Sequence, residues 1–331
     1  MAAVVVSVIN LKGGVGKSTL TMMLGEFLAF RHGKNVLLVD MDAQANLSYC
    51  MVSQHNIERQ ERASRTTYHL FKAALSGREV HIDRFITRPP LVVSNIARAG
   101  MAHHGTRLEM VVSTPSVAQL DEELLRLWED NRPMPEGVRH VLNQALQPVL
   151  GHYDYILIDC PPGLSLFSSA ALLASHYFIT PIIPEPLSLL GVNLVQDRAR
   201  ELKGRTVEFK GVILNIVKHY RKTHQRISGD LYETQEPKYQ PFQYWLPDNE
   251  TIRKLGEFDP DEQGQWALGV DQKFPSLHAK YSLSYQLSNP ASGPLSRTNV
   301  EGPRYRLEER IERLTEEFEE RCGRPPRRLV S

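Results

Sequence analysis

The chain has 331 residues, of which 41% are hydrophobic and 23% are charged, and its formal net charge is +1. These values are ordinary for a globular protein, and the length suits one large α/β domain or one domain with an appendage. A charge so near zero excludes a global attraction to nucleic acid or membranes, so any basic surface must be local. No uncharged stretch is long enough to span a bilayer.

Cysteine usage and the first residues predict a cytoplasmic protein. The 3 cysteines, Cys50, Cys160 and Cys322, lack metal-ligand spacing, and such an odd, scattered set is typical of a reducing compartment. The first apolar run has no basic segment before it and leads directly into a glycine-rich turn. That is not the pattern of a signal peptide.

Residues near the start have the order of a strand, a phosphate-binding loop and a helix. An apolar run over 4–9 leads to the loop Lys12, Gly13, Gly14, Val15, Gly16, Lys17, Ser18 and Thr19. Glycines let backbone N–H groups close around phosphate oxygens, and a helix that begins near Lys17 adds a partial positive charge. We expect Lys17 to reach the β- and γ-phosphates of a nucleoside triphosphate and the Ser18 hydroxyl to bind Mg²⁺. The alternative is a glycine turn without a ligand.

One departure from the general P-loop pattern is informative. That pattern has a glycine six positions before the final lysine, where this chain has Leu11, and here a second lysine, Lys12, follows. The run 12–18 resembles the deviant Walker A motif of ParA/MinD-type ATPases. The resemblance implies that Lys12 reaches across a dimer interface to the partner's nucleotide, so that two copies of the chain enclose ATP between them.

Two carboxylates follow the next apolar run, 36–39, at the edge where ligands bind in open α/β sheets. The segment 40–46 resembles switch I of the same family, with Ala43 in place of the usual proline. By that match Asp42 orients the attacking water and contributes to the metal site, and Asp40 supports the metal shell. The alternative for Asp40 is a helix cap or an Asx turn.

Residues 155–159 form an apolar run that ends in Asp159, the Walker B pattern, whose carboxylate holds Mg²⁺, often through water. Cys160-Pro161-Pro162-Gly163 follows and resembles the family's switch II. A nitrogenase-reductase type of P-loop protein is a rival, because Cys160 lies beside this switch. That type needs a cysteine pair to bridge a cluster, and no second suitable cysteine is evident.

The adenine side of the site is predicted only by the resemblance. Asn215 ends an expected strand over 210–215 and matches the family position that reads the adenine edge, although an ordinary turn asparagine is the alternative. Residues 243–248 resemble the family's last strand, and the region of Pro247 then lines the adenine pocket.

Other elements follow from apolar periodicity. We expect a strand over 177–183 that is broken by Pro181, a strand over 108–112, and helices over about 67–75, 117–127, 138–149, 190–202 and 305–322. Histidines 103 and 104 are better interpreted as part of a solvated loop than as metal ligands.

The predicted organisation is a P-loop ATPase domain over 1–258, with a poorly legible insertion at 51–106. Residues 259–331 then form an irregular segment and a C-terminal amphipathic helix that packs on the same domain. The polar face of this helix is acidic, and anionic lipid would repel it, which argues against membrane attachment.

A basic patch is expected over 198–226. Its members are Arg198, Arg200, Lys203, Arg205, Lys210, Lys218, Arg221, Lys222 and Arg226. Such a patch can bind the DNA backbone without reading sequence, and the alternative is a solvated helix face plus a loop.

The motifs together predict a doubly wound, mostly parallel α/β sheet with helices on both faces. The resemblance covers about 1–50 and 107–258 and implies a slow, Mg²⁺-dependent ATPase of the ParA type. Such a homodimeric switch partitions DNA or another cargo with an adaptor or centromere-binding protein, and associates with the nucleoid. The rival function is an ATP-gated scaffold in another assembly, without DNA binding.

Overall fold

The computed structural model describes residues 2–52, 54–88, 106–129, 137–202, 207–218, 220–234, 237–249, 252 and 303–323. In this part of the chain one sheet has the strand order β3-β4-β2-β5-β1-β6-β7. Its strands are β1 (Val4–Val8), β2 (Val36–Asp40), β3 (Ile86–Thr87), β4 (Leu108–Val111), β5 (Tyr155–Asp159), β6 (Tyr177–Ile182) and β7 (Glu208–Leu214). All neighbours pair in parallel except β3 and β4, which are antiparallel.

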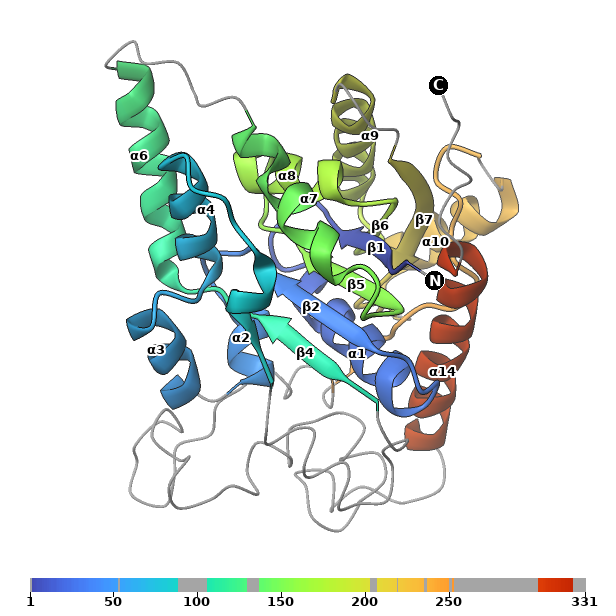
Figure 1. Ribbon diagram of the computed structural model, residues 1–331. Coiled ribbons are helices and arrows are strands. Elements are labelled where there is room, and N and C mark those ends of the chain that lie inside the picture. Colours follow the sequence, from blue (N-terminus) through green and yellow to red (C-terminus); the bar gives the residue numbers. More distant parts are fainter. Residues whose placement is uncertain are drawn as a thin grey trace, which may run out of the picture.

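Helices cover both faces of the sheet (Figure 1). One face carries α4 (Thr67–Leu75), α6 (Ala118–Glu129), α7 (Val141–Leu146), α8 (Leu166–Ala174) and α9 (Pro186–Glu201). The other carries α1 (Lys17–Phe30), α2 (Asn46–Met51) and α14 (Pro303–Cys322). The remaining helical elements are α3 (Gln54–Arg62), η1 (Ile82–Phe85), η2 (Pro115–Val117), η3 (Val138–His140), η4 (Gln147–Val149) and α10 (Lys222–Thr234). The predicted doubly wound fold is therefore correct.

The central strands are buried along their whole length, because helices cover them on both sides. Their side chains divide between two cores, with Val4, Val6 and Val8 facing α1 and Val5 and Ile9 facing α8. Burial on both faces explains why the sequences of these strands are continuous apolar runs instead of alternating apolar and polar residues.

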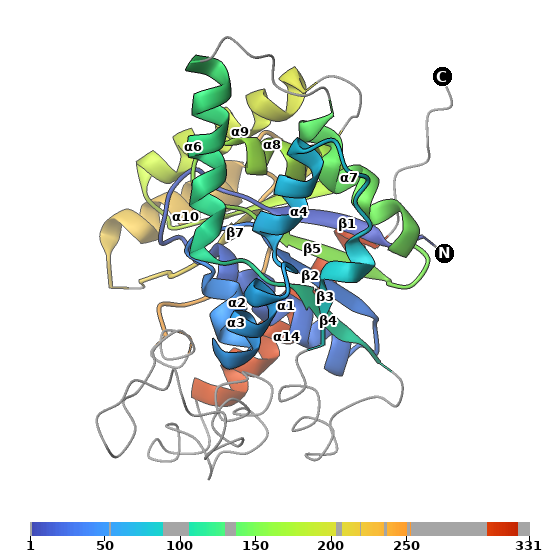
Figure 2. The same cartoon turned by 60° about the vertical axis from the view of Figure 1, so that its left-hand side comes forward.

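Residues 54–88 are ordered and belong to the body of the fold, although the sequence pattern there was poorly legible. Figure 2 shows α3 and α4 against the edge of the sheet that ends in β3 and β4. Leu70 and Phe71 of α4 are buried in the same core as the neighbouring strands. Histidines 103 and 104 lie outside the described residues, as do 253–302, so the expectations there stay predictions, as does the division of the chain at 258.

Several expected elements differ in detail. β6 continues through Pro181. Proline has no N–H group to donate, but β1 pairs with β6 only as far as Ile179, so no strand hydrogen bond from Pro181 to β1 is needed. α9 begins at Pro186 instead of near 190, since proline is well suited to the first helical position. Residues 138–149 form η3, α7 and η4 instead of one helix.

The expected last strand over 243–248 is wrong. This segment runs beside β7 and forms one isolated bridge, between Val217 and Pro247, instead of a regular ladder. Leu246 nevertheless donates a backbone hydrogen bond to Leu214, at 2.9 Å.

α14 packs on the body of the fold. Its apolar stripe, Leu307, Ile311, Leu314 and Phe318, is buried in the core that contains α1. Among the helices that the structure describes, none is long and apolar enough to cross a membrane.

A histidine links the end of α1 to the acidic face of α14. His32 contacts Glu319 through Nδ1 and Glu312 through Nε2, the latter at 3.0 Å, and Lys34 also pairs with Glu319, at 3.2 Å. The hydrogen bond to Glu319, followed by that to Glu312, raises the pKa of His32 above its ordinary value, although burial opposes this.

This link predicts a pH-dependent stability. Because the pKa of His32 is raised in the folded state, its contribution is fully present below about pH 6.5, the ordinary value for histidine, and is lost as the pH rises through the raised pKa. We expect His32→Gln to lower the free energy of unfolding at pH 6 by about 1.5–3 kcal/mol, the order of a hydrogen bond to a charged group, and by less at pH 9. Urea unfolding across this range checks it. The exposed His152, as His152→Gln, is the control, and a parallel loss at both pH values would contradict the prediction.

Candidate nucleotide-binding site

Three predicted motifs meet at the carboxyl edge of the sheet. β5 lies between β1 and β2, and its register pairs Asp159 with Val8 on one side and with Asp40 on the other. The strands therefore end at the same level, where the loop 9–16 begins. This is the edge at which open α/β sheets bind ligands.

The glycine loop has the backbone of a phosphate cradle. Gly14 and Gly16 have φ values of 72° and 83°, which side-chain-bearing residues rarely adopt. A Cβ atom at Gly16 would lie 2.2 Å from Nδ2 of Asn215, so only glycine fits there. α1 begins at the next residue, and no acidic side chain occupies its first turn. Its N-terminal N–H groups can therefore serve an anion.

Lys17 is nearly buried at the start of α1, and its Nζ donates to the backbone oxygen of Lys12 at 3.1 Å. Burial lowers the pKa of Lys17, while Asp159 and Asp42 oppose the shift. A buried ammonium group that donates to its own loop is placed to turn toward a phosphate in that loop.

Asp159 is fully buried, and neither of its carboxylate oxygens has a hydrogen-bond partner among the described residues. Burial, followed by the nearby Asp40, raises its pKa, and Ser18 and Lys17 oppose the rise. Ser18 thus faces Asp159 without forming a well-shaped hydrogen bond to it. Unsatisfied buried carboxylate oxygens are costly, and a cation bound beside Ser18 would satisfy them.

Asp40 and Asp42 have different surroundings. Oδ2 of Asp40 accepts hydrogen bonds from the N–H and hydroxyl groups of Ser48, at 2.9 and 2.7 Å, and its Oδ1 accepts from the N–H of Asp42. Asp40 therefore forms an Asx turn and holds the first turn of α2. This is the structural role, helix cap or Asx turn, that was the alternative to a role in the metal shell. Burial raises the pKa of Asp40 to about 7.

Asp42 is 7% exposed, and only Oδ1 has a described partner, the N–H of Gln44 at 2.9 Å. The Ser113 hydroxyl donates to the backbone oxygen of Asp42 and fixes the turn. Among the described residues, no group of three or more His, Cys, Asp and Glu side chains could hold a metal ion by itself. A divalent cation here would therefore need the Ser18 hydroxyl, water or phosphate oxygens in addition to carboxylates.

Lys12 forms an ion pair within its own chain. Its Nζ lies 2.6 Å from Glu185, the N-cap residue of α9, and the lysine side chain is 37% exposed. This hydrogen bond is the main cause that lowers the pKa of Glu185. Exposed ion pairs contribute little to stability, so Lys12 can leave Glu185 at low cost.

Residues 3–209 match the family model described as an AAA domain, which is more than half of the chain. The chain belongs to the family of ParA-type P-loop ATPases. The virulence plasmid ParA family protein pGP5-D of Chlamydia psittaci is 29% identical over 225 residues, 68% of this chain and 73% of that protein. The sporulation initiation inhibitor Soj of Bacillus subtilis is 30% identical over 217 residues, 64% of this chain and 72% of Soj.

Solved structures share the fold of this ParA-type chain. A plasmid partition protein from Borrelia burgdorferi has a TM-score of 0.56 and 23% identity, over 77% of this chain and 95% of that one. Cobyrinic acid a,c-diamide synthase from Mycobacterium smegmatis, with a bound ATP analog and magnesium, has a TM-score of 0.58 and 21% identity, over 77% and 92%.

Asn215 lies against the P-loop of this ParA-type chain. Its Nδ2 donates to the backbone oxygen of Val15 at 2.9 Å, and its Oδ1 accepts from the N–H of Ile216. The side chain thus supports the loop, and its predicted contact with adenine stays a prediction. Pro247 lies beside the same turn, through its bridge to Val217.

Sequence reasoning missed two polar residues that shape the site. Asn10 is fully buried, donates to the backbone oxygen of Pro181 at 2.7 Å and accepts from the N–H of Lys12 at 2.9 Å, so it ties the loop to β6. The second residue is Glu185, which lies between Pro184 and Pro186 and holds Lys12. Glu185 is the N-cap residue of α9, three residues after β6 ends at Ile182, and the signal that could have found it is a carboxylate in the short connection that follows a strand.

The predicted basic patch is not one surface. β7 separates the end of α9 from the start of α10, and its seven residues span about 23 Å. Arg198, Arg200 and Lys210 lie toward the beginning of β7, where they pair with Glu201, Asp197 and Glu208. Lys218, Arg221, Lys222 and Arg226 lie beyond its end, on the P-loop edge. Lys203 and Arg205 lie outside the described residues.

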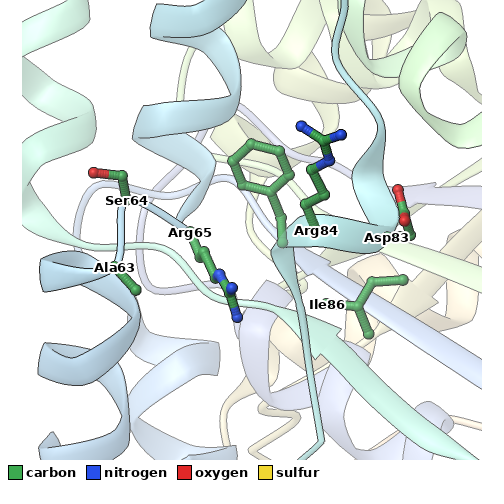
Figure 3. Close-up of a pocket in the computed structure, with 7 residues that line it drawn as sticks. Ala63, Ser64, Arg65, Asp83, Arg84 and Ile86 are labelled. Atoms are coloured by element: carbon green, nitrogen blue, oxygen red, sulfur yellow. The ribbon is translucent and has the colours of Figure 1, made fainter.

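Two further features do not support a function other than nucleotide binding. These are Cys160 and a surface hollow. Cys160 is fully buried, which does not suit a cluster shared at a dimer axis. A hollow of about 580 Å³ is lined by 63–65 and 83–86, away from the P-loop. The guanidinium groups of Arg65 and Arg84 point in different directions there and do not converge on one ligand (Figure 3).

Proposed function

We propose that the chain binds ATP with Mg²⁺, dimerises around it, hydrolyses it slowly, and in the ATP-bound dimer binds DNA to partition or position DNA or another cargo. The observation that carries the proposal is the carboxylate of Asp159, whose oxygens lack a hydrogen-bond partner within the described part of the chain, beside Ser18 and Lys17 at the mouth of a glycine loop. The similarity to ParA-family proteins, among them the chromosome partitioning protein ParA of Myxococcus xanthus, supports the partition role.

The residues present fit the chemistry of Mg-ATP. The loop 12–19 would enclose the phosphates with backbone N–H groups, and Lys17 would neutralise the charge that develops on the transferred phosphoryl group. Ser18, Asp159 and Asp42 would hold Mg²⁺, which supplies charge stabilisation when bound. Of Asp40, Asp42 and Asp159, only Asp42 has a side chain that is not completely buried, and its Oδ2 has no partner among the described residues. It is therefore the best candidate to orient the attacking water.

Dimerisation is supported by an exposed apolar face beside the P-loop. Leu187, Leu190 and Leu194 follow one face of α9 and are 70, 58 and 52% exposed. Leu164, in the loop after β5, is 47% exposed. The start of α9 directly follows Glu185, the residue that holds Lys12, so the apolar face and the lysine lie at the same edge. A patch of large apolar side chains at such an edge is typical of a protein-protein interface.

Substitutions in the P-loop and in switch I should separate binding from turnover. We expect Lys17→Ala to abolish nucleotide binding, because it removes the cation in the cradle. Asp42→Ala should keep ATP binding and dimerisation but lower turnover by at least about 100-fold, the usual contribution of such a group. Calorimetric titration and phosphate release measure the two properties. Equal turnover in Asp42→Ala and the unaltered chain would remove the role assigned to this carboxylate.

The role of Lys12 is tested by oligomeric state. Lys12→Ala should keep the monomer fold and lose the ATP-dependent dimer, as measured by size-exclusion chromatography with light scattering. Lys34→Ala is a matched control, since its side chain is also 37% exposed and paired with a glutamate, but it precedes β2 at the opposite edge of the sheet. Leu190→Asp should lose the dimer as well. A dimer of unchanged stability in Lys12→Ala would contradict the proposal.

DNA binding separates the partition role from an ATP-gated scaffold. In the Asp42→Ala background, where ATP persists, the chain should shift DNA of random sequence at low salt. Lys222→Ala combined with Arg226→Ala should weaken this binding, because these exposed side chains at the start of α10 can contact phosphates. Arg200→Ala, at the other end of the sheet, is the control. If the ATP-bound chain ignores DNA, the scaffold function replaces the partition role.

A further inference from the structure

α14 holds the segment 240–247 through Glu317. Both carboxylate oxygens of Glu317 accept from the N–H of Gln243, at 3.0 and 2.9 Å, and Oε2 also accepts from the N–H of Tyr244 at 3.3 Å. Glu317 is 8% exposed, so these bonds are shielded from water. Since the segment has no regular ladder, side-chain acceptors replace the strand partners that it lacks.

Arg321 fixes the other end of the same segment. It lies 2.7 Å from Glu317, and it donates to the backbone oxygens of Lys210, Gln240 and Pro241 at 3.0, 2.8 and 2.9 Å. Its guanidinium also lies over the ring of the buried Phe242, 4.1 Å from the centroid.

Gly211 of β7 allows this close approach. Its φ is 126°, and a Cβ there would lie 2.0 Å from the backbone oxygen of Gln240 and 2.8 Å from Nη1 of Arg321. The arginine, the glycine and the segment therefore form one tight junction.

From this junction the segment continues to the turn after β7. Val217 donates to the backbone oxygen of Leu246 at 3.1 Å, Asp248 donates to that of Val217 at 3.0 Å, and Pro247 pairs with Val217. The phosphate loop is supported separately. Asn215, which holds Val15, donates its own N–H to Ile182 of β6 at 2.8 Å, and Asn10 ties the loop to Pro181.

We propose that Glu317 and Arg321 are positioning residues for the base side of the nucleotide site. They act through segment 240–247, which carries Pro247, and not through the phosphate loop. The inference rests on the proposed function, because it needs ATP to be the ligand and Pro247 to face its base. Without these residues the segment occupies its binding position for only part of the time, and the apparent affinity falls by that fraction.

The test compares ATP with tripolyphosphate, which has the phosphates without a base. Glu317→Ala should weaken ATP binding by about tenfold, the equivalent of one charged hydrogen bond, while the affinity for tripolyphosphate stays within about twofold. Glu316→Ala is the control, because Glu316 is only partly buried and pairs only with Arg313 among the described residues. Isothermal titration with Mg²⁺ present gives both constants, and circular dichroism verifies the fold.

The outcomes are distinct. Equal loss of ATP and tripolyphosphate affinity, or no loss of either, overturns the inference. If Glu317→Ala unfolds, ATP binding by Glu317→Gln tests the inference. Glutamine keeps the shape of the side chain, but its NH₂ group faces another donor, either Arg321 or a backbone N–H. Unchanged ATP affinity in Glu317→Gln then overturns the inference. If the unaltered chain binds tripolyphosphate but not ATP, the proposed function fails instead.

Discussion

The buried carboxylate of Asp159 is the group on which the rest of the site depends. It lies at the end of a strand that is enclosed on both faces, beside Asp40 and opposite the end of β1, and it has no hydrogen-bond partner in the described structure. A buried charge without a partner is costly, and proteins keep such groups where a ligand satisfies them. The nearest opposing charge is Lys17, itself nearly buried, and these two groups define where phosphates and a cation can lie together.

The loop around this charge pair is held by asparagines and not by the glycines. The glycines permit the loop conformation, but Asn10 and Asn215 fix it, because each bridges the loop to β6 or β7 through a buried amide. Asp40 has a related role, since it binds Ser48 and Asp42 and so shapes the turn that presents Asp42. A polar residue at a strand end can thus be structural, and burial together with partners separates it from a group that is available for chemistry.

The C-terminal helix extends this logic to the other side of the site. Its apolar stripe packs on the core, while Glu317 and Arg321 bind the backbone of a segment far away in the sequence. Its acidic face is therefore partly used within the fold, at His32 and at residues 243–244. These contacts explain why the polar face of α14 is acidic, the feature that argues against its attachment to a membrane.

The amino-acid sequence by itself determined the P-loop, the strands that end in Asp40 and Asp159, and the amphipathic character of α14, because each depends on local spacing and apolar periodicity. Only the tertiary structure decided which strands are neighbours, and placing β5 between β1 and β2 brings Asp159 to the loop. It also divided the basic run over 198–226 between two edges of the sheet, because β7 separates positions that are close in sequence. The ion pair of Lys12 with Glu185 and the hold of Glu317 on residues 243–244 join residues more than 70 positions apart, and no local pattern carries that information.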